Sequence, residues 1–166
     1  MISKEKAKER VKQLVKEFSE FSKEELDKKS EIQIQYEFID ELFKALGWNM
    51  RKDVEREERV LKGRADYIFR LGNQETLVVE AKKTSVSLGE DQGRQAVSYA
   101  YHRKIKFSIL TNFKYIRIYH ALSNIKNIDK NLLFWLEFKD FEKEDADKII
   151  NTLKNMFGFT ENLIRE

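Results

Sequence analysis

The sequence predicts an α/β fold, with a central mixed sheet of four to five strands flanked by helices and an N-terminal helical extension. Segments with apolar residues at helical spacing alternate with short β-branched or alternating runs that are typical of strands. Gly72-Asn73 separates two such runs, as in a hairpin turn. With 166 residues and no internal repeat or linker, the chain is expected to be one domain. We divide it into an N-terminal helix (1–29), a core (30–120) and a C-terminal strand and helix (121–166).

Two helices are expected at the start of the chain. Residues 3–29 place apolar side chains at helical spacing among Lys and Glu, which predicts one helix. A second helix is expected over 31–46, with Ser30 as its N-cap and Gly47 as the glycine that ends it. Trp48 is expected to pack back onto the last turn of this helix as a core residue.

The strands are expected where apolar or alternating runs lie between polar turns. A weakly patterned strand is expected near 48–52, and a short one around Val60. The clearer strands are 65–71, 75–82, 106–111, 115–119 and 132–138. Two further helices are expected, over 92–103 and over 142–157.

Composition excludes several classes of function. The chain has no cysteine and only two histidines, His102 and His120, so disulfides, thiolate metal sites and a His-rich zinc site are not expected. No apolar stretch is long enough to span a membrane, and the N-terminus has no apolar signal segment. Together these features fit a cytoplasmic location without membrane contact.

Charge is distributed unevenly along the chain, although the net charge is only +3. Between Gln92 and His120 there are six basic residues and no acid, whereas from Asp129 to the end nine acids face six bases. A basic middle segment suits contact with a phosphate backbone on one face. The alternative, equally weighted, is a solvated face without a partner.

Three charged residues stand against the apolar pattern of the core. Glu80 interrupts the apolar run from Leu77 to Ala81, and Lys82 lies two residues later on the same face of the strand. Asp66 stands fourteen residues before Glu80. Two carboxylates on neighbouring strands can hold a divalent cation, with a lysine beside it to orient water. The alternative is a buried ion pair, because inward charges must be paired or metal-bound.

The hairpin between Asp66 and Glu80 gives this idea a geometric test. A plain two-residue loop at Gly72-Asn73 would pair Asp66 with Val79 and put it on the opposite face from Glu80. A shared metal site therefore predicts a three-residue loop, such as 72–74, or a β-bulge that sets Asp66 opposite Glu80.

The order of these motifs resembles the PD-(D/E)XK nuclease superfamily, and more closely the N-terminal endonuclease domain of Type IIG restriction-modification enzymes and Type I restriction subunits. The resemblance covers about residues 10–120 and rests on five segments: 30–48, 65–70, 79–83, 95–99 and 108–113. The proline of the family motif is replaced here by Ala65, a departure that affects backbone geometry and removes no reacting group.

The resemblance implies a restriction-endonuclease-like fold and Mg²⁺-dependent hydrolysis of DNA phosphodiester bonds, with Mn²⁺ as a substitute. Asp66 and Glu80 are implied to ligate the metal together with the Ala81 carbonyl, while Lys82 positions the attacking water. Gln95 is implied to hydrogen-bond the catalytic site or a DNA phosphate.

The family's N-terminal acid has two candidates, Glu31 and Glu37. Glu31 fits the family's helix pattern better and is favoured, to hold a metal-bound water or a second ion. Six residues separate the two acids, about 240° around an α-helix, so they cannot share one face. Both one-metal and two-metal schemes fit the sequence.

Double-stranded DNA is the implied partner of the site. The residues that could contact it are Lys83, Arg94, Tyr99, Arg103 and Lys104, with core packing as the alternative for Tyr99. The resemblance implies methyltransferase, specificity or motor domains as further partners. This chain contains no AdoMet-binding or P-loop signature, so it is expected to be a cleavage module alone or an excised domain. Two other functions stay open: a structure-selective nuclease such as a Holliday-junction resolvase, and a catalytically silent DNA-binding domain.

Overall fold

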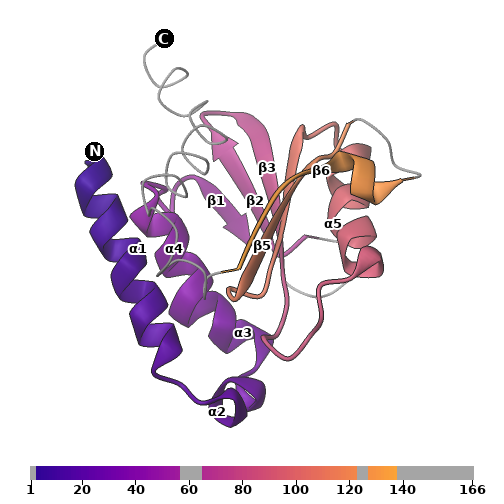
Figure 1. Cartoon of the computed structure of the whole chain (residues 1–166). Helices are drawn as coiled ribbons and strands as arrows, with labels where there is room; N and C mark the ends of the chain where they lie inside the picture. The colour runs from indigo at the N-terminus through magenta and orange to yellow at the C-terminus, as the bar shows by residue number, and fades with distance from the viewer. Residues whose placement is uncertain (1–2, 57–64, 123–126, 138–166) are drawn as a thin grey trace.

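A computed structural model of the chain describes residues 3–56, 65–122 and 127–137, which form one six-stranded sheet with helices on both faces (Figure 1). The strands lie side by side in chain order: β1 (Val54–Arg56), β2 (Tyr67–Leu71), β3 (Gln74–Ala81), β4 (Phe107–Thr111), β5 (Tyr115–His120) and β6 (Leu132–Glu137). Neighbours are antiparallel except for β3 and β4, which are parallel because α5 (Glu90–His102) lies between them in the chain. The predicted mixed α/β fold is confirmed, with six strands instead of four to five.

The N-terminal extension consists of two helices, α1 (Lys4–Ser19) and α2 (Lys23–Lys28), so the prediction of one helix over 3–29 is wrong. The break occurs at Ser22, which caps α2. The Ser22 side chain accepts from the Glu25 amide, and the Glu25 carboxylate accepts from the Ser22 amide. This reciprocal capping box stabilises a new helix start at the expense of a continuous helix.

The second predicted helix is confirmed in extent but contains a π-helical turn. Three consecutive segments make it up: α3 (Glu31–Ile34), the π-helical turn η1 (Gln35–Ile39) and α4 (Asp40–Ala45). Ser30 caps it, and Gly47 follows its end with a φ of +97°, as expected of a helix-terminating glycine. Trp48 is buried and packs its ring 4.9 Å from that of Phe69, which confirms it as a core residue.

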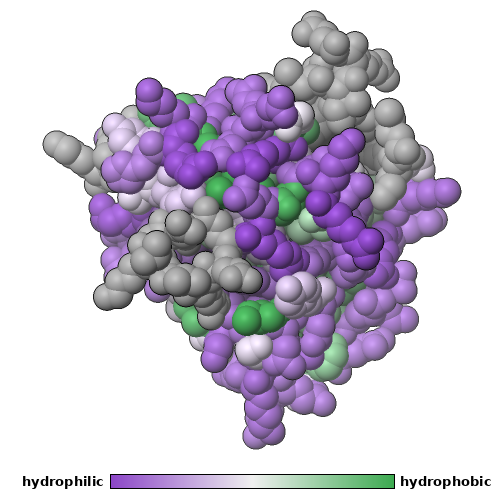
Figure 2. Space-filling view, turned by 180° about the vertical axis from the view of Figure 1, so that it is seen from behind, coloured by the Kyte–Doolittle hydropathy of each residue, from purple (hydrophilic) through white to green (hydrophobic). Residues whose placement is uncertain are grey.

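The two faces of the sheet carry separate apolar cores. On one face α1 and the α3–η1–α4 helix cover Tyr67, Phe69 and Val79, whereas on the other α5 covers Ile68 and Val78. Because strand side chains alternate, Glu80 shares the α5 face with Val78. The view in Figure 2 shows a mainly hydrophilic outer surface with small, separate apolar spots.

Most predicted strands are found within two residues of their expected bounds, and the helix over 92–103 corresponds to α5. The strand predicted near 48–52 is wrong, because the Lys52 and Asp53 amides both donate to the Asn49 carbonyl in a turn and β1 begins only at Val54. The predictions around Val60 and over 142–157 fall outside the described residues. None of the described helices is both long and apolar enough to cross a membrane.

Candidate active site

A β-bulge in the β2–β3 hairpin sets the geometry of the site. Leu71 pairs with Gln74, so Gly72-Asn73 is a two-residue turn, but the register shifts between Phe69 and Arg70, and Tyr67 pairs with Val79. The extra residue is Thr76, whose hydroxyl donates to the Phe69 carbonyl over 3.2 Å. The bulge alternative is therefore confirmed and the three-residue loop is not formed. Continued by one residue, this register places Asp66 opposite Glu80.

Asp66 lies just before β2 and reaches across to β3. One of its oxygens, Oδ2, accepts a hydrogen bond from the Ala81 amide at 2.7 Å. The Asp66 side chain therefore continues the β2–β3 pairing beyond the last backbone partners. This contact brings together two of the three residues predicted to hold a metal.

Glu80 is the buried centre of a small polar cluster, in which Gln95 is exposed at the surface. It is 4% exposed, and its Oε1 accepts a 2.8 Å hydrogen bond from Gln95 on α5 and pairs with the Lys82 ammonium. Lys82 is also largely buried, with 17% of its side chain exposed. Two donors thus offset the cost of burying this carboxylate. The Lys82 ammonium and the Gln95 amide thus meet at one oxygen of Glu80, which is compatible with either a metal site or a structural ion pair.

The segment after Lys82 is held in place by Asn112, which the sequence reasoning did not single out. The Lys82 amide donates to the Thr111 carbonyl at 2.9 Å, extending the parallel β3–β4 pairing by one residue. Asn112 is 1% exposed, donates to the Val86 carbonyl at 3.1 Å and accepts from the Tyr115 amide at 2.9 Å. The available signal was a polar residue directly after a buried strand.

The two candidate acids of the N-terminal helix differ in their surroundings. Glu31 is partly buried and opens α3, on the face of the sheet opposite α5. Glu37 lies in the π-helical turn and forms a 2.5 Å ion pair with Lys29, whose ammonium also lies over the Phe21 ring. The ion pair gives Glu37 a role within the helical layer.

The residues predicted to contact DNA fall into two groups. Arg94 pairs with Glu90 on its own helix, and Arg103 donates to both oxygens of Glu75, over 2.9 Å and 2.5 Å, with its guanidinium 5.8 Å from the centre of the Tyr99 ring. Lys83 and Lys104 are exposed. Arg103, followed by Arg70, holds the pKa of Glu75 below its usual range, although burial acts in the opposite direction. The Arg103 charge thus serves the fold near the end of β3 opposite to Glu80.

A buried polar group on the opposite face was also missed from the sequence. Asp40 is 5% exposed, accepts from the Tyr67 hydroxyl at 2.9 Å and pairs with the Arg56 guanidinium. Burial and then the Asp40 charge raise the pKa of Tyr67 above its ordinary value, so its hydroxyl stays protonated and donates. Asp40 interrupts the apolar pattern of its helix, which was the signal available.

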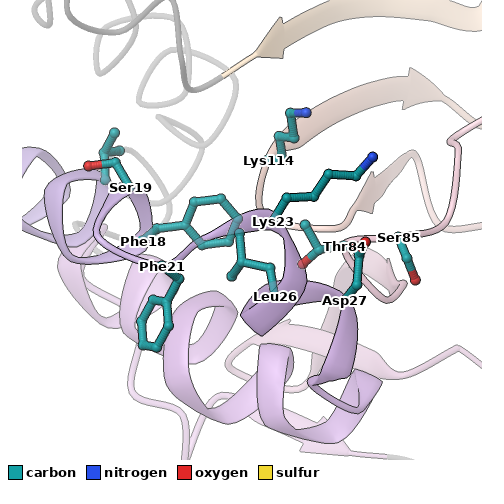
Figure 3. Close-up of a pocket in the computed structure, with 10 residues that line it drawn as sticks. Phe18, Ser19, Phe21, Lys23, Leu26, Asp27, Thr84, Ser85 and Lys114 are labelled. Atoms are coloured by element: carbon teal, nitrogen blue, oxygen red, sulfur yellow. The ribbon is translucent and has the colours of Figure 1, made fainter.

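A cavity of about 560 Å³ lies between the helical extension and the loop after Lys83 (Figure 3). Its apolar side is formed by α1 and α2, and its polar side includes Thr84, Ser85 and Lys114. The buried Thr84 hydroxyl has no hydrogen-bond partner among the described residues. Glu80, Lys82 and Gln95 do not line this cavity, so it is separate from the polar cluster.

The oxygen donors at the end of β3 suit a hard cation. Asp66 and Glu80 supply carboxylates, and the Ala81 carbonyl belongs to the residue directly after Glu80. Mg²⁺ typically uses one or two carboxylates and keeps several waters. Within the described ranges, no group of three His, Cys, Asp or Glu side chains is arranged to hold a metal. A cation held by these oxygens would take most of its ligands from water, as Mg²⁺ commonly does.

Comparison with known proteins gives a family and one curated relative. The family described as MmeI, N-terminal domain, matches residues 13–157. A protein of Escherichia coli, "Type II restriction enzyme and methyltransferase RM.Eco57I", is 35% identical over 117 aligned residues, and the match covers 60% of this chain and 12% of that protein. The chain thus corresponds to a small part of this relative's length. No solved structure matches the chain significantly.

Proposed function

Because the chain belongs to the family of MmeI N-terminal domains, we propose that it is the DNA-cleavage module of a restriction-modification enzyme and that it hydrolyses phosphodiester bonds with Mg²⁺. The observation that carries this proposal is the bulge that sets Asp66 opposite Glu80, beside Lys82 and Gln95. A hairpin without the bulge would separate the two carboxylates to opposite faces.

In this mechanism Asp66, Glu80 and the Ala81 carbonyl hold Mg²⁺, with Mn²⁺ as a substitute. When bound, such an ion would supply positive charge near the phosphate and would lower the pKa of a bound water. Gln95 keeps Glu80 oriented through its 2.8 Å hydrogen bond, so that one carboxylate oxygen is fixed before DNA arrives.

Lys82 is assigned to the attacking water and the phosphate. Its ammonium lies beside Glu80 at the end of β3, and the hydrogen bond from the Lys82 amide to the Thr111 carbonyl fixes the backbone that carries this side chain. Donors positioned in this way stabilise the charge that develops on the phosphate without reorganisation.

Glu31 is assigned to a metal-bound water or a second ion, in preference to Glu37. Glu37 forms an ion pair with Lys29 and is assigned a structural role in the helix. Substituting each acid in turn distinguishes this structural role from a role at the metal. Glu31→Gln should lower cleavage, whereas Glu37→Gln should chiefly affect the helix.

Partner segments are proposed from the curated relative. Its name includes a methyltransferase, and the matched region is 12% of its length. We therefore assign methylation and sequence reading to parts that act together with this module. Double-stranded DNA is the substrate, and Lys83 and Lys104 are the exposed lysines proposed to contact its backbone.

The test is cleavage of supercoiled plasmid and of a four-way junction by the 166-residue chain, with Mg²⁺, Mn²⁺ or EDTA. The wild type should nick or linearise the plasmid with metal and not with EDTA, while Asp66→Ala and Lys82→Ala should not. Glu41→Gln is the control, because Glu41 is a carboxylate in an ion pair with Arg10 away from the cluster.

Three outcomes would contradict parts of this proposal. Cleavage that survives both substitutions excludes the assigned centre. Absence of both Mn²⁺ binding and cleavage in the wild type favours a catalytically silent domain. A strong preference for the four-way junction over plasmid favours a junction-resolving nuclease.

A further inference from the structure

The buried group formed by Asp40, Arg56 and Tyr67 joins three elements on the face opposite Glu80. Asp40 begins α4, Arg56 ends β1 and Tyr67 begins β2. The Asp40 carboxylate contacts both partners. Its Oδ1 accepts a hydrogen bond from the Tyr67 hydroxyl at 2.9 Å, and its Oδ2 forms an ion pair with the Arg56 guanidinium. The carboxylate thereby fixes one helix to two strands.

Aromatic rings enclose the Arg56 guanidinium. It lies 4.4 Å from the centre of the Tyr36 ring and 4.9 Å from that of Tyr67. Tyr36 belongs to the π-helical turn and is 59% exposed, whereas Tyr67 is fully buried. Such cation–π contacts restrict the plane of the guanidinium as well as its position.

Stability alone does not account for this group of three polar residues. Replacing a buried ion pair by apolar residues of similar volume is often neutral or stabilising, because charges lose their hydration on burial. What the pair supplies is directional contact, since each hydrogen bond fixes a distance and an angle that apolar packing leaves free. The group therefore matters more for fixing the relative positions of the helix and the two strands than for the free energy of unfolding.

Tyr67 is the residue directly after Asp66. The backbone pairing of β2 with β3 ends at Tyr67 and Val79, so Asp66 lies beyond the regular ladder. Anchoring the Tyr67 ring on one face of the sheet fixes the peptide that carries Asp66 toward the other. The same helix begins at Glu31, so Asp40 also relates the proposed N-terminal acid to this peptide.

We propose that Asp40, Arg56 and Tyr67 are positioning residues that hold the Asp66 carboxylate against the end of β3, at the place where it meets Glu80. The inference rests on the proposed function for its purpose, but its geometry is independent of metal. The 2.7 Å bond from the Ala81 amide to Asp66 reports the position of this carboxylate directly.

The first experiment is amide hydrogen exchange of the full chain without metal, comparing wild type, Tyr67→Phe and Asp40→Asn. The Ala81 amide should exchange about tenfold faster in both variants relative to Leu77, which lies inside the β2–β3 ladder opposite Phe69, because the acceptor of the Ala81 amide is no longer fixed. Tyr119→Phe is the matched control, since it removes the hydroxyl of a buried tyrosine on β5.

The second experiment measures Mn²⁺ binding by calorimetry and the Mg²⁺ concentration for half-maximal cleavage. In Tyr67→Phe the affinity for Mn²⁺ should fall roughly tenfold and the Mg²⁺ concentration for half-maximal cleavage should rise roughly tenfold, as is common when a residue that supports a metal ligand is changed. Tyr119→Phe should match the wild type in both measurements. Tyr67→Phe keeps the buried ring, so a folding failure of Asp40→Asn would not remove the test.

Unchanged Ala81 exchange in Tyr67→Phe, with metal binding equal to that of Tyr119→Phe, would overturn the proposal. If the wild type neither binds Mn²⁺ nor cuts DNA, the proposed function fails separately. Faster Ala81 exchange would then still support the positioning of Asp66.

Discussion

The carboxylate of Asp66 accepts a 2.7 Å hydrogen bond from the amide of Ala81, across the end of the β2–β3 pair. The bond links the acid before β2 to the strand that carries Glu80 and Lys82. It exists because Thr76 adds one residue to β3 and shifts the register. A local irregularity of the hairpin thus determines which side chains can act together.

Asp66→Asn should separate chemistry from folding. The amide oxygen can still accept from Ala81, so the free energy of unfolding should change by less than about 1 kcal/mol. Cleavage should fall about 100-fold or more, because a neutral oxygen is a poor ligand for Mg²⁺. Urea unfolding and plasmid cleavage measure the two effects. Retained cleavage would remove Asp66 from the site.

Gln95→Ala should reduce cleavage less than the loss of Lys82. Glu80 would lose its neutral donor from α5 but keep the pairing with Lys82, so we expect a decrease of roughly tenfold in kcat. Arg94→Ala, one residue earlier on the same helix, is the control for helix stability. Equal effects of Gln95→Ala and Arg94→Ala would count against a role for the Gln95 contact.

Lys83 and Arg103 should differ in binding to DNA. Lys83→Ala should weaken binding and lower the slope of log affinity against log salt by about one, as loss of a phosphate contact does. Arg103→Gln should instead reduce stability, because its guanidinium holds Glu75. Fluorescence anisotropy at several salt concentrations, with thermal unfolding of both variants, checks this. A larger loss of salt slope for Arg103→Gln would reverse the assignment.

The ion pairs of Glu75 should make stability depend on pH. Arg103 and Arg70 lower the pKa of Glu75 in the folded chain, so its contribution is present above the ordinary glutamate pKa and is lost as pH falls through the lowered value. Glu75→Gln should cost about 0.5–1 kcal/mol at pH 7. In urea titrations the difference from wild type should shrink as pH falls below the ordinary glutamate pKa and disappear below the lowered one. A difference that persists there would mean that packing, not charge, is lost.

Much of the fold follows from local patterns in the sequence. Alternating and apolar runs predicted β2 to β6. Ser30 as a capping residue at the start and Gly47 as a glycine at the end predicted the bounds of the second helix. The break at Ser22 was missed because Leu26 continues the apolar spacing of α1 into α2. The local capping contacts of Ser22 and Glu25 outweighed that periodicity.

Part of the candidate site could likewise be predicted from the sequence, and part could not. Glu80 and Lys82 stand out because charge interrupts an apolar strand, and the bulge was predicted from the need to bring Asp66 to their face. The contacts of Asp40 with Arg56 and Tyr67 join residues far apart in the chain. No local spacing encodes these contacts, although Asp40 alone does interrupt the apolar pattern of its helix.

The bulge at Thr76 also limits how the hairpin can vary in length. Adding one residue to each strand beyond the bulge preserves which side chains face each other, because strand side chains alternate with a period of two. A single inserted or deleted residue reverses one strand relative to the other. Relatives that keep both carboxylates on one face should therefore differ in this hairpin by even numbers of residues, unless a second irregularity restores the register.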